Sequence, residues 1–141
     1  MGASFDSPAE FKDVIDRVFT MMDEDPDMGP KLRDADVPMR YEFGDVDLVA
    51  NIRATREGED GNLYWEWSDD VDWEPRVKMG MSSETANKYF QGKENVAMAI
   101  ARRRIKSGGD VKAALALMPV TKPVFAQYRA MIEEEYPHLL V

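Results

Sequence analysis

The chain of 141 residues contains no cysteine and only one histidine, His138. Because there is no thiol, disulfide bonds, thiolate zinc sites and cysteine nucleophiles are excluded, and the chain suits a reducing compartment. No apolar run approaches the roughly 18 residues that a membrane-spanning helix requires. The segment from Met1 to Asp6 lacks a basic region followed by an apolar stretch, so we expect no signal peptide. Together these absences predict a cytoplasmic protein.

Catalytic and metal-binding signatures are also scarce. The sequence has no Gly-x-Ser-x-Gly element, no phosphate-binding loop and no dinucleotide-binding motif. His138 lies near the C-terminus, where chains are usually mobile, and it has no evident Ser or Asp partner for base catalysis. Asp23, Asp25 and Asp27 resemble the start of a calcium loop, but the sixth position is Met28 instead of glycine. We therefore predict no catalytic residues, no cofactor and no metal site.

The charge balance is acidic, with 27 Asp and Glu residues against 18 Lys and Arg residues and a formal net charge of −9. Nucleic acids and anionic membranes are polyanions, so this charge argues against a nucleic-acid partner and disfavours membrane contact, of which only a transient form stays open. The length is typical of one domain, and such a chain buries roughly 68% of its surface on folding. We predict a single globular domain over residues 1–141.

The first half shows one helix and then strands. Ser7, Pro8 and Glu10 form a capping signature. An apolar stripe follows at helical spacing: Phe11, Val14, Ile15, Val18 and Met22. Residues 23–38 are expected to form a polar connector. Period-two alternation then predicts four strands, whose apolar positions are Met39, Tyr41 and Phe43; Leu48, Ala50, Ile52 and Ala54; Leu63, Trp65 and Trp67; and Val77, Met79 and Met81. Their short connections favour antiparallel pairing.

The second half is mainly helical. Ser82 or Ser83 caps a helix that ends at Gly92, and the apolar run 96–101 predicts a buried helix. A short fifth strand is expected within residues 102–107, before a turn at Gly108 and Gly109. Asp110 caps a helix that stops at Pro119, and Thr121 and Pro123 begin the last helix. Because a sheet with one apolar face needs a cover, these helices are expected to pack on it.

Several residues in register from Phe90 to Asp110 carry a family resemblance. A Gly-Lys-x-Asn element precedes the apolar helix, and a basic strand ends in Gly-Asp. The residues concerned are Gly92, Lys93, Asn95, Gly109 and Asp110. On these residues, the region 73–136 resembles the sterol carrier protein 2 (SCP2) domain, also called non-specific lipid transfer protein. The N-terminal half agrees with that family in element order more than in residues.

The resemblance implies an α+β, two-layer fold in which helices cover one face of a five-stranded, mostly antiparallel sheet. It also implies an apolar tunnel between the layers, since family members bind sterols, fatty acids, acyl-CoA esters and phospholipids. The function implied is non-catalytic carriage of such a ligand inside the cell. The family's eukaryotic carriers are typically basic and end in a peroxisomal signal, whereas this chain is acidic and ends in Leu-Leu-Val.

Methionines and aromatic residues on the inward faces are the candidate tunnel lining. Methionine adapts to ligands of different shape, and aromatic rings offer flat apolar surface. The alternative is ordinary core packing, which apolar residues at helical spacing usually indicate. The candidate lining residues are Trp65, Trp67, Met79, Met81, Phe90, Met98, Leu115, Met118, Phe125, Tyr128 and Met131.

Arg102, Arg103 and Arg104 form a basic cluster on this acidic chain. Their position at a helix end, where cations oppose the negative end of the dipole, favours a structural role. The alternative hypothesis is that these arginines anchor a carboxylate, phosphate or CoA group of the ligand.

Two rival hypotheses stay open. The chain could be an accessory domain serving a lipid-metabolising enzyme, with a reduced or filled cavity. It could also be an enzyme acting on acyl-CoA or steroid substrates, which would require a charged pocket residue with a strongly shifted pKa.

Overall fold

The computed structural model describes residues 4–141, so Met1 to Ala3 of the segment tested for a signal peptide lie outside it. The elements in chain order are α1 (Pro8–Glu24), α2 (Met28–Ala35), β1 (Met39–Phe43), β2 (Leu48–Ala54), β3 (Leu63–Glu66), β4 (Val77–Gly80), α3 (Ser83–Phe90), α4 (Val96–Ala101), β5 (Lys106–Gly109), α5 (Val111–Thr121), α6 (Val124–Glu135) and the 3-10 turn η1 (Pro137–Leu139). Within residues 4–141, every helix is too short or too polar to cross a bilayer.

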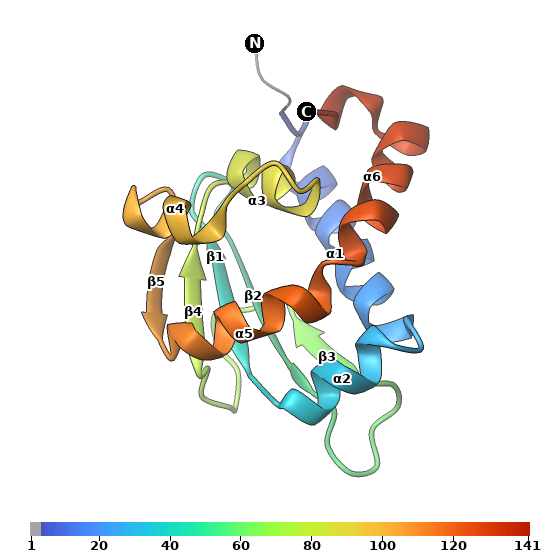
Figure 1. Ribbon diagram of the computed structural model, residues 1–141, viewed down its shortest axis with the longest axis vertical. Coiled ribbons are helices and arrows are strands. Elements are labelled where there is room, and N and C mark those ends of the chain that lie inside the picture. Colours follow the sequence, from blue (N-terminus) through green and yellow to red (C-terminus); the bar gives the residue numbers. More distant parts are fainter. Residues whose placement is uncertain (1–3) are drawn as a thin grey trace.

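The five strands form one sheet in the order β3-β2-β1-β4-β5, so β1 is the central strand (Figure 1). Three pairings are antiparallel, but β1 and β4 are parallel, with Tyr41 opposite Met79. The prediction that the first four strands pair antiparallel throughout was therefore wrong. β3 already occupies the free edge of β2, so the segment after β3 crosses the sheet to the open edge of β1 before β4 begins.

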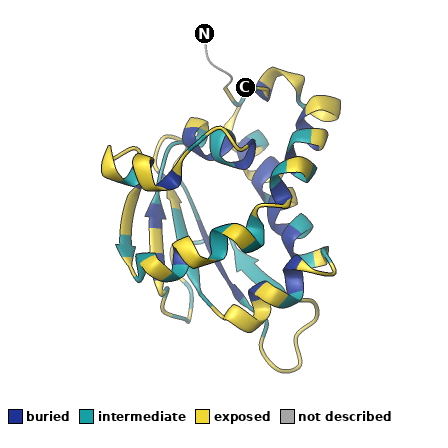
Figure 2. Ribbon diagram, in the orientation of Figure 1, coloured by how far each residue is buried: buried dark blue, intermediate teal, exposed yellow. Residues whose placement is uncertain are grey.

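Helix α1 forms as its capping signature predicts. The Ser7 hydroxyl accepts a hydrogen bond from the Glu10 N–H, while the Glu10 carboxylate accepts one from the Asp6 N–H. The predicted stripe is buried and joined by Phe19. Helix α1 packs on the sheet, and α6 packs against α1 and α3, with its buried side toward them (Figure 2). The main core thus lies between α1, α3, α6 and the sheet.

Helix α2 replaces the polar connector expected over residues 23–38. Its buried face comprises only Met28, Gly29 and Leu32, so the segment shows no extended periodic pattern. The Asp25 carboxylate accepts hydrogen bonds from the N–H groups of Asp27 and Met28, at 2.9 and 2.8 Å, and holds the entry turn. This turn, rather than hydrophobic periodicity, marks where the helix starts, and the N-cap residue Asp27 makes no side-chain cap of its own.

Three features of the second half differ from expectation: the burial of α4, the end of α5 and the extent of β5. Helix α4 is not buried all round: Val96 and Ala99 are buried, while Met98 is 46% exposed. Helix α5 continues through Pro119 to Thr121, because the Lys122 N–H still bonds to the Met118 carbonyl beyond the proline.

Strand β5 covers Lys106–Gly109, including the two glycines that were expected to form a turn. Gly109 has φ of +76°, and a Cβ at this position would collide with the Arg76 carbonyl. The glycine therefore permits the close approach of β5 to the start of β4.

Candidate functional site

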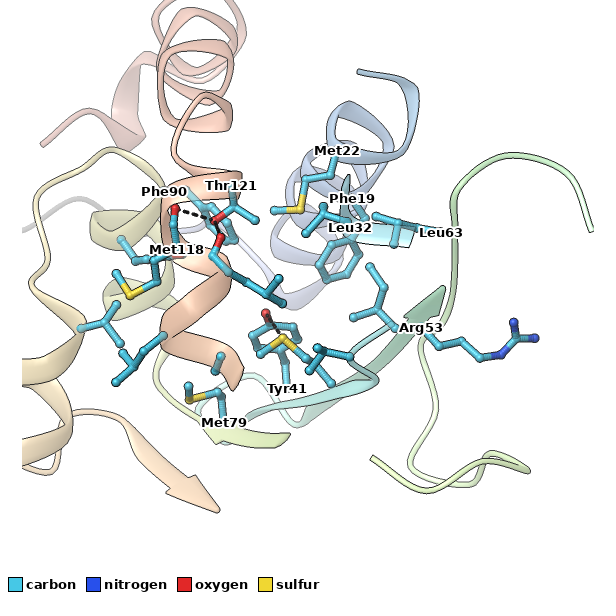
Figure 3. Close-up of a pocket in the computed structure, with 18 of the residues that line it drawn as sticks. Phe19, Met22, Leu32, Tyr41, Arg53, Leu63, Met79, Phe90, Met118 and Thr121 are labelled. Atoms are coloured by element: carbon cyan, nitrogen blue, oxygen red, sulfur yellow. Dashed lines mark hydrogen bonds between the residues drawn. The ribbon is translucent and has the colours of Figure 1, made fainter. Parts of the chain in front are cut away.

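An apolar cavity of about 90 Å³ lies between the sheet and the helices that cover it (Figure 3). The residues lining it come from α1, α2, α3, α4, α5 and strands β1 to β4, with a few from the adjoining loops. They are Phe19, Met22, Leu32, Val37, Met39, Tyr41, Ile52, Arg53, Ala54, Leu63, Met79, Met81, Tyr89, Phe90, Val96, Ile105, Ala114, Leu115, Leu117, Met118 and Thr121. By comparison, a single water needs about 10–15 Å³, so the space is several times larger than one water site.

Methionine is prominent in this lining. Met22, Met39, Met79, Met81 and Met118 contribute to it, which is five of the ten methionines in the chain. Unbranched thioether side chains can change rotamer at low cost, so these walls can adapt to what they enclose. The cavity wall is therefore softer than a wall of β-branched residues would be.

Leu115 marks where the cavity reaches the surface. It lines the cavity and is also 37% exposed, whereas every other lining residue is buried or half-buried. Helix α5, which carries Leu115, buries only Ala114 fully, although nearly all of its residues are apolar. Helix α5, which buries few of its side chains, therefore borders the opening of the cavity at Leu115.

The uncharged polar side chains in the lining are those of Tyr41, Tyr89 and Thr121. The Tyr41 hydroxyl donates to the Met39 sulfur at 3.4 Å, and a thioether is a weak acceptor. The Thr121 hydroxyl instead donates back to carbonyls of its own helix. Burial raises the pKa of both Tyr41 and Tyr89, so both phenols stay protonated at neutral pH.

Arg53 is the one charged residue among the described lining residues, and its head group points out of the cavity (Figure 3). The guanidinium donates to both carboxylate oxygens of Glu59, at 2.7 and 2.9 Å, and lies over the rings of Tyr64 and Trp73. This pairing holds the pKa of Glu59 down to about 2. The cation is therefore engaged outside, and only its stem borders the apolar space.

Five of the predicted lining residues border the cavity: Met79, Met81, Phe90, Leu115 and Met118. The other six lie elsewhere. Trp65 and Trp67 face α1, where both indole N–H groups donate to the Asp16 carboxylate, at 2.8 and 3.0 Å. Met98 faces outward on α4.

Phe125, Tyr128 and Met131 belong to the closed interface of α6. The Tyr128 hydroxyl donates to Asn87 at 2.6 Å within the core. The helical stripe of these residues was identified correctly, but it packs against α1 and α3 instead of facing a void.

The arginine cluster does not line the cavity. Arg102, Arg103 and Arg104 are all exposed, and Arg104 donates to the Glu94 carboxylate at 2.7 Å. They follow the end of α4 in a turn where Arg103 has φ of +62°. This placement fits the structural role at a helix end more closely than that of an internal anchor.

Tyr41 was not among the predicted lining residues, although the sequence pattern indicated that its side chain faces inward. Alternation with Arg40 and Glu42 placed it on the inward face of its strand together with Met39. The lining residues of α1 and α2 were also missed. Their apolar faces look the same in sequence whether they border a void or a packed core.

His138 has partners that the sequence did not suggest. Its Nε2 lies 2.9 Å from a Glu10 carboxylate oxygen and 3.7 Å from that of Asp6, so the C-terminal turn is tied to the start of α1. The hydrogen bond that the His138 ring donates to the Glu10 carboxylate raises the pKa of His138. Asp23 also has a structural role, since it accepts from the N–H groups of Asn62 and Leu63, both at 2.7 Å.

Solved structures define the class to which this arrangement belongs. No protein-family model and no curated protein matches the sequence. The UbiJ-SCP2 ubiquinone synthesis protein superposes with a TM-score of 0.60 at 8% identity, over 86% of this chain and 95% of that chain. Sterol carrier protein 2 from Yarrowia lipolytica, in its apo form, gives 0.56 at 14% identity, over 88% of this chain and 98% of that chain. The chain has the SCP2 fold, and the predicted fold class is confirmed.

A longer protein contains a similar unit. A double mutant of the sec-alkyl sulfatase PisA1 gives a TM-score of 0.55 at 18% identity, over 68% of this chain. The Pisa1 enzyme from Pseudomonas sp. gives 0.52 at 18% identity, over 72% of this chain. The chain spans only 16% of that sulfatase. At these identities the likenesses describe the fold, and the site has to be judged from its own residues.

Proposed function

We propose that this chain reversibly binds an apolar ligand, such as a fatty acid, an acyl-CoA ester, a sterol or another lipid, in the cavity and carries it without covalent chemistry. In this proposal residues 1–141 act as one lipid-binding domain inside the cell. The observation that carries it is the void between sheet and helices, lined almost wholly by apolar side chains. A protein of similar fold is named a sterol carrier protein.

The energetics favour a ligand that widens the cavity. The present volume of about 90 Å³ is smaller than that of an engineered core cavity of about 150 Å³ that binds benzene. A longer chain therefore requires the methionines and α5 to move apart. Each buried methylene contributes about 0.8 kcal/mol, so about ten of them match the roughly 8 kcal/mol of a micromolar Kd before ordering costs.

The rival function is an accessory domain serving a lipid-metabolising enzyme. The likeness to one part of a much longer sulfatase supports such a role. That hypothesis expects a reduced or filled interior; the cavity of about 90 Å³ is small but not filled.

Native mass spectrometry of freshly purified protein tests the proposed function. We expect an apolar small molecule to co-purify, or a delipidated sample to take up one laurate or methyl laurate per chain. The absence of both adducts, from protein that is folded by circular dichroism, would contradict the proposal.

A further inference from the structure

Tyr41 occupies a central position for a ligand in the cavity. It lies on the central strand β1, and its neighbours on the adjacent strands are Ala50 and Met79. Phe19 and Phe43 lie beside its ring, with centroids 6.2 Å away in each case. The side chain is half-buried because it borders the void, and it points up from the sheet toward α5 (Figure 3).

The Tyr41 hydroxyl is poorly satisfied in this setting. Its only hydrogen bond among the described residues is to the Met39 sulfur. A buried hydroxyl without a good acceptor costs free energy, and phenylalanine would fill the same space without that cost. The hydroxyl is therefore available to donate to an oxygen that a ligand brings into the cavity.

Tyr41 also borders a second, smaller cavity of about 20 Å³. The residues that line both cavities are Phe19, Tyr41, Met81, Tyr89 and Phe90. A ligand that occupies both cavities would therefore contact Tyr41.

The charge of the lining restricts what that oxygen can be. Arg53 is the only cation among the described lining residues, and it is paired with Glu59 outside the cavity. Burying a carboxylate that has no cation to pair with costs several kcal/mol. A protonated phenol can donate to a neutral carbonyl, ester or hydroxyl oxygen without any such charge penalty.

From these contacts we infer that the cavity selects neutral lipids that place one hydrogen-bond-accepting oxygen beside Tyr41, with the polar end directed inward. This inference rests on the proposed function and names its ligand class. Tyr41 is then a ligand-binding residue, and ionised fatty acids are disfavoured.

A set of three probes with the same chain length tests the inference. Methyl laurate, laurate and dodecane are each used to displace the neutral fluorophore N-phenyl-1-naphthylamine at pH 8. We expect methyl laurate to bind about five-fold more tightly than dodecane, from one hydrogen bond, and about a hundred-fold more tightly than laurate.

Variants assign the hydrogen bond. Tyr41→Phe should abolish the preference for methyl laurate over dodecane and leave dodecane binding unchanged. Tyr64→Phe is the matched control, because the Tyr64 hydroxyl donates to Glu66 and does not line the cavity. Tyr89→Phe should retain the preference.

The outcomes distinguish the neutral-ligand inference from the proposed function. Equal binding of laurate and methyl laurate would overturn the neutral-ligand inference while the proposed function stands. An unchanged preference in Tyr41→Phe would overturn the assignment to Tyr41. Failure of the fluorophore and all three probes to bind would overturn the proposed function itself.

Discussion

The two halves of the interior use the same residue types in opposite ways. Around α6 the core is closed: the Tyr128 hydroxyl donates to Asn87 at 2.6 Å, and the Asn87 and Gln91 amides donate to the Leu139 carbonyl. Under α5 the core is open, and the Tyr41 hydroxyl has only a sulfur at 3.4 Å. The polar groups of the closed half are satisfied within the protein, whereas the open half leaves apolar space and a hydroxyl with only a weak acceptor.

The largest expected difference concerns the two tyrosines. Tyr128→Phe should lower the free energy of unfolding by about 1.5 kcal/mol, because a buried hydrogen bond in a satisfied network is lost. Tyr41→Phe makes the same chemical change in the open half, and it should alter stability by less than about 0.5 kcal/mol. Urea denaturation of both variants measures the comparison. Equal losses would show that the two environments are not distinct.

A smaller effect concerns the tie between His138 and Glu10 in the closed half. The pKa of His138 is raised in the folded state above 6.5, so the tie stabilises the protein fully below that pH. The contribution is lost as the pH rises through the higher, folded-state value. The effect is small because the imidazole is 39% exposed.

The measurement is the melting temperature of wild type and His138→Gln between pH 5 and pH 8. Wild type should lose more stability than the variant as the pH rises. Parallel profiles for the two proteins would show that His138 does not contribute to the pH dependence of stability.

Local signals predicted the elements whose formation depends on neighbouring residues. Ser7 and Asp110 cap α1 and α5 as expected, and alternation located β1 to β4. Helix α2 was not predicted because its buried face consists only of Met28, Gly29 and Leu32, which is too short to show helical periodicity. The parallel pairing of β1 and β4 was not predicted. Strand pairing depends on which edge of the sheet is free, and the sequence of a single strand does not indicate this.

The cavity was harder to predict than the fold for a physical reason. Met118 and Met131 both lie on apolar helix faces, yet one borders the void and the other is packed in the closed core. Hydrophobic periodicity reports burial, and burial is the same beside a void as beside another side chain. The gap depends on how the layers are spaced, which no local pattern encodes.

The claim that ligands occupy the cavity is tested most directly by filling the cavity with a larger side chain from α5. Leu117 and Ala116 are adjacent on α5, but only Leu117 lines the cavity, while Ala116 is exposed. Leu117→Trp should weaken binding of N-phenyl-1-naphthylamine by about ten-fold or more, and Ala116→Trp should change it by less than about two-fold. Both variants should unfold cooperatively. Wild-type affinity in a folded Leu117→Trp variant would contradict the claim that ligands occupy this cavity.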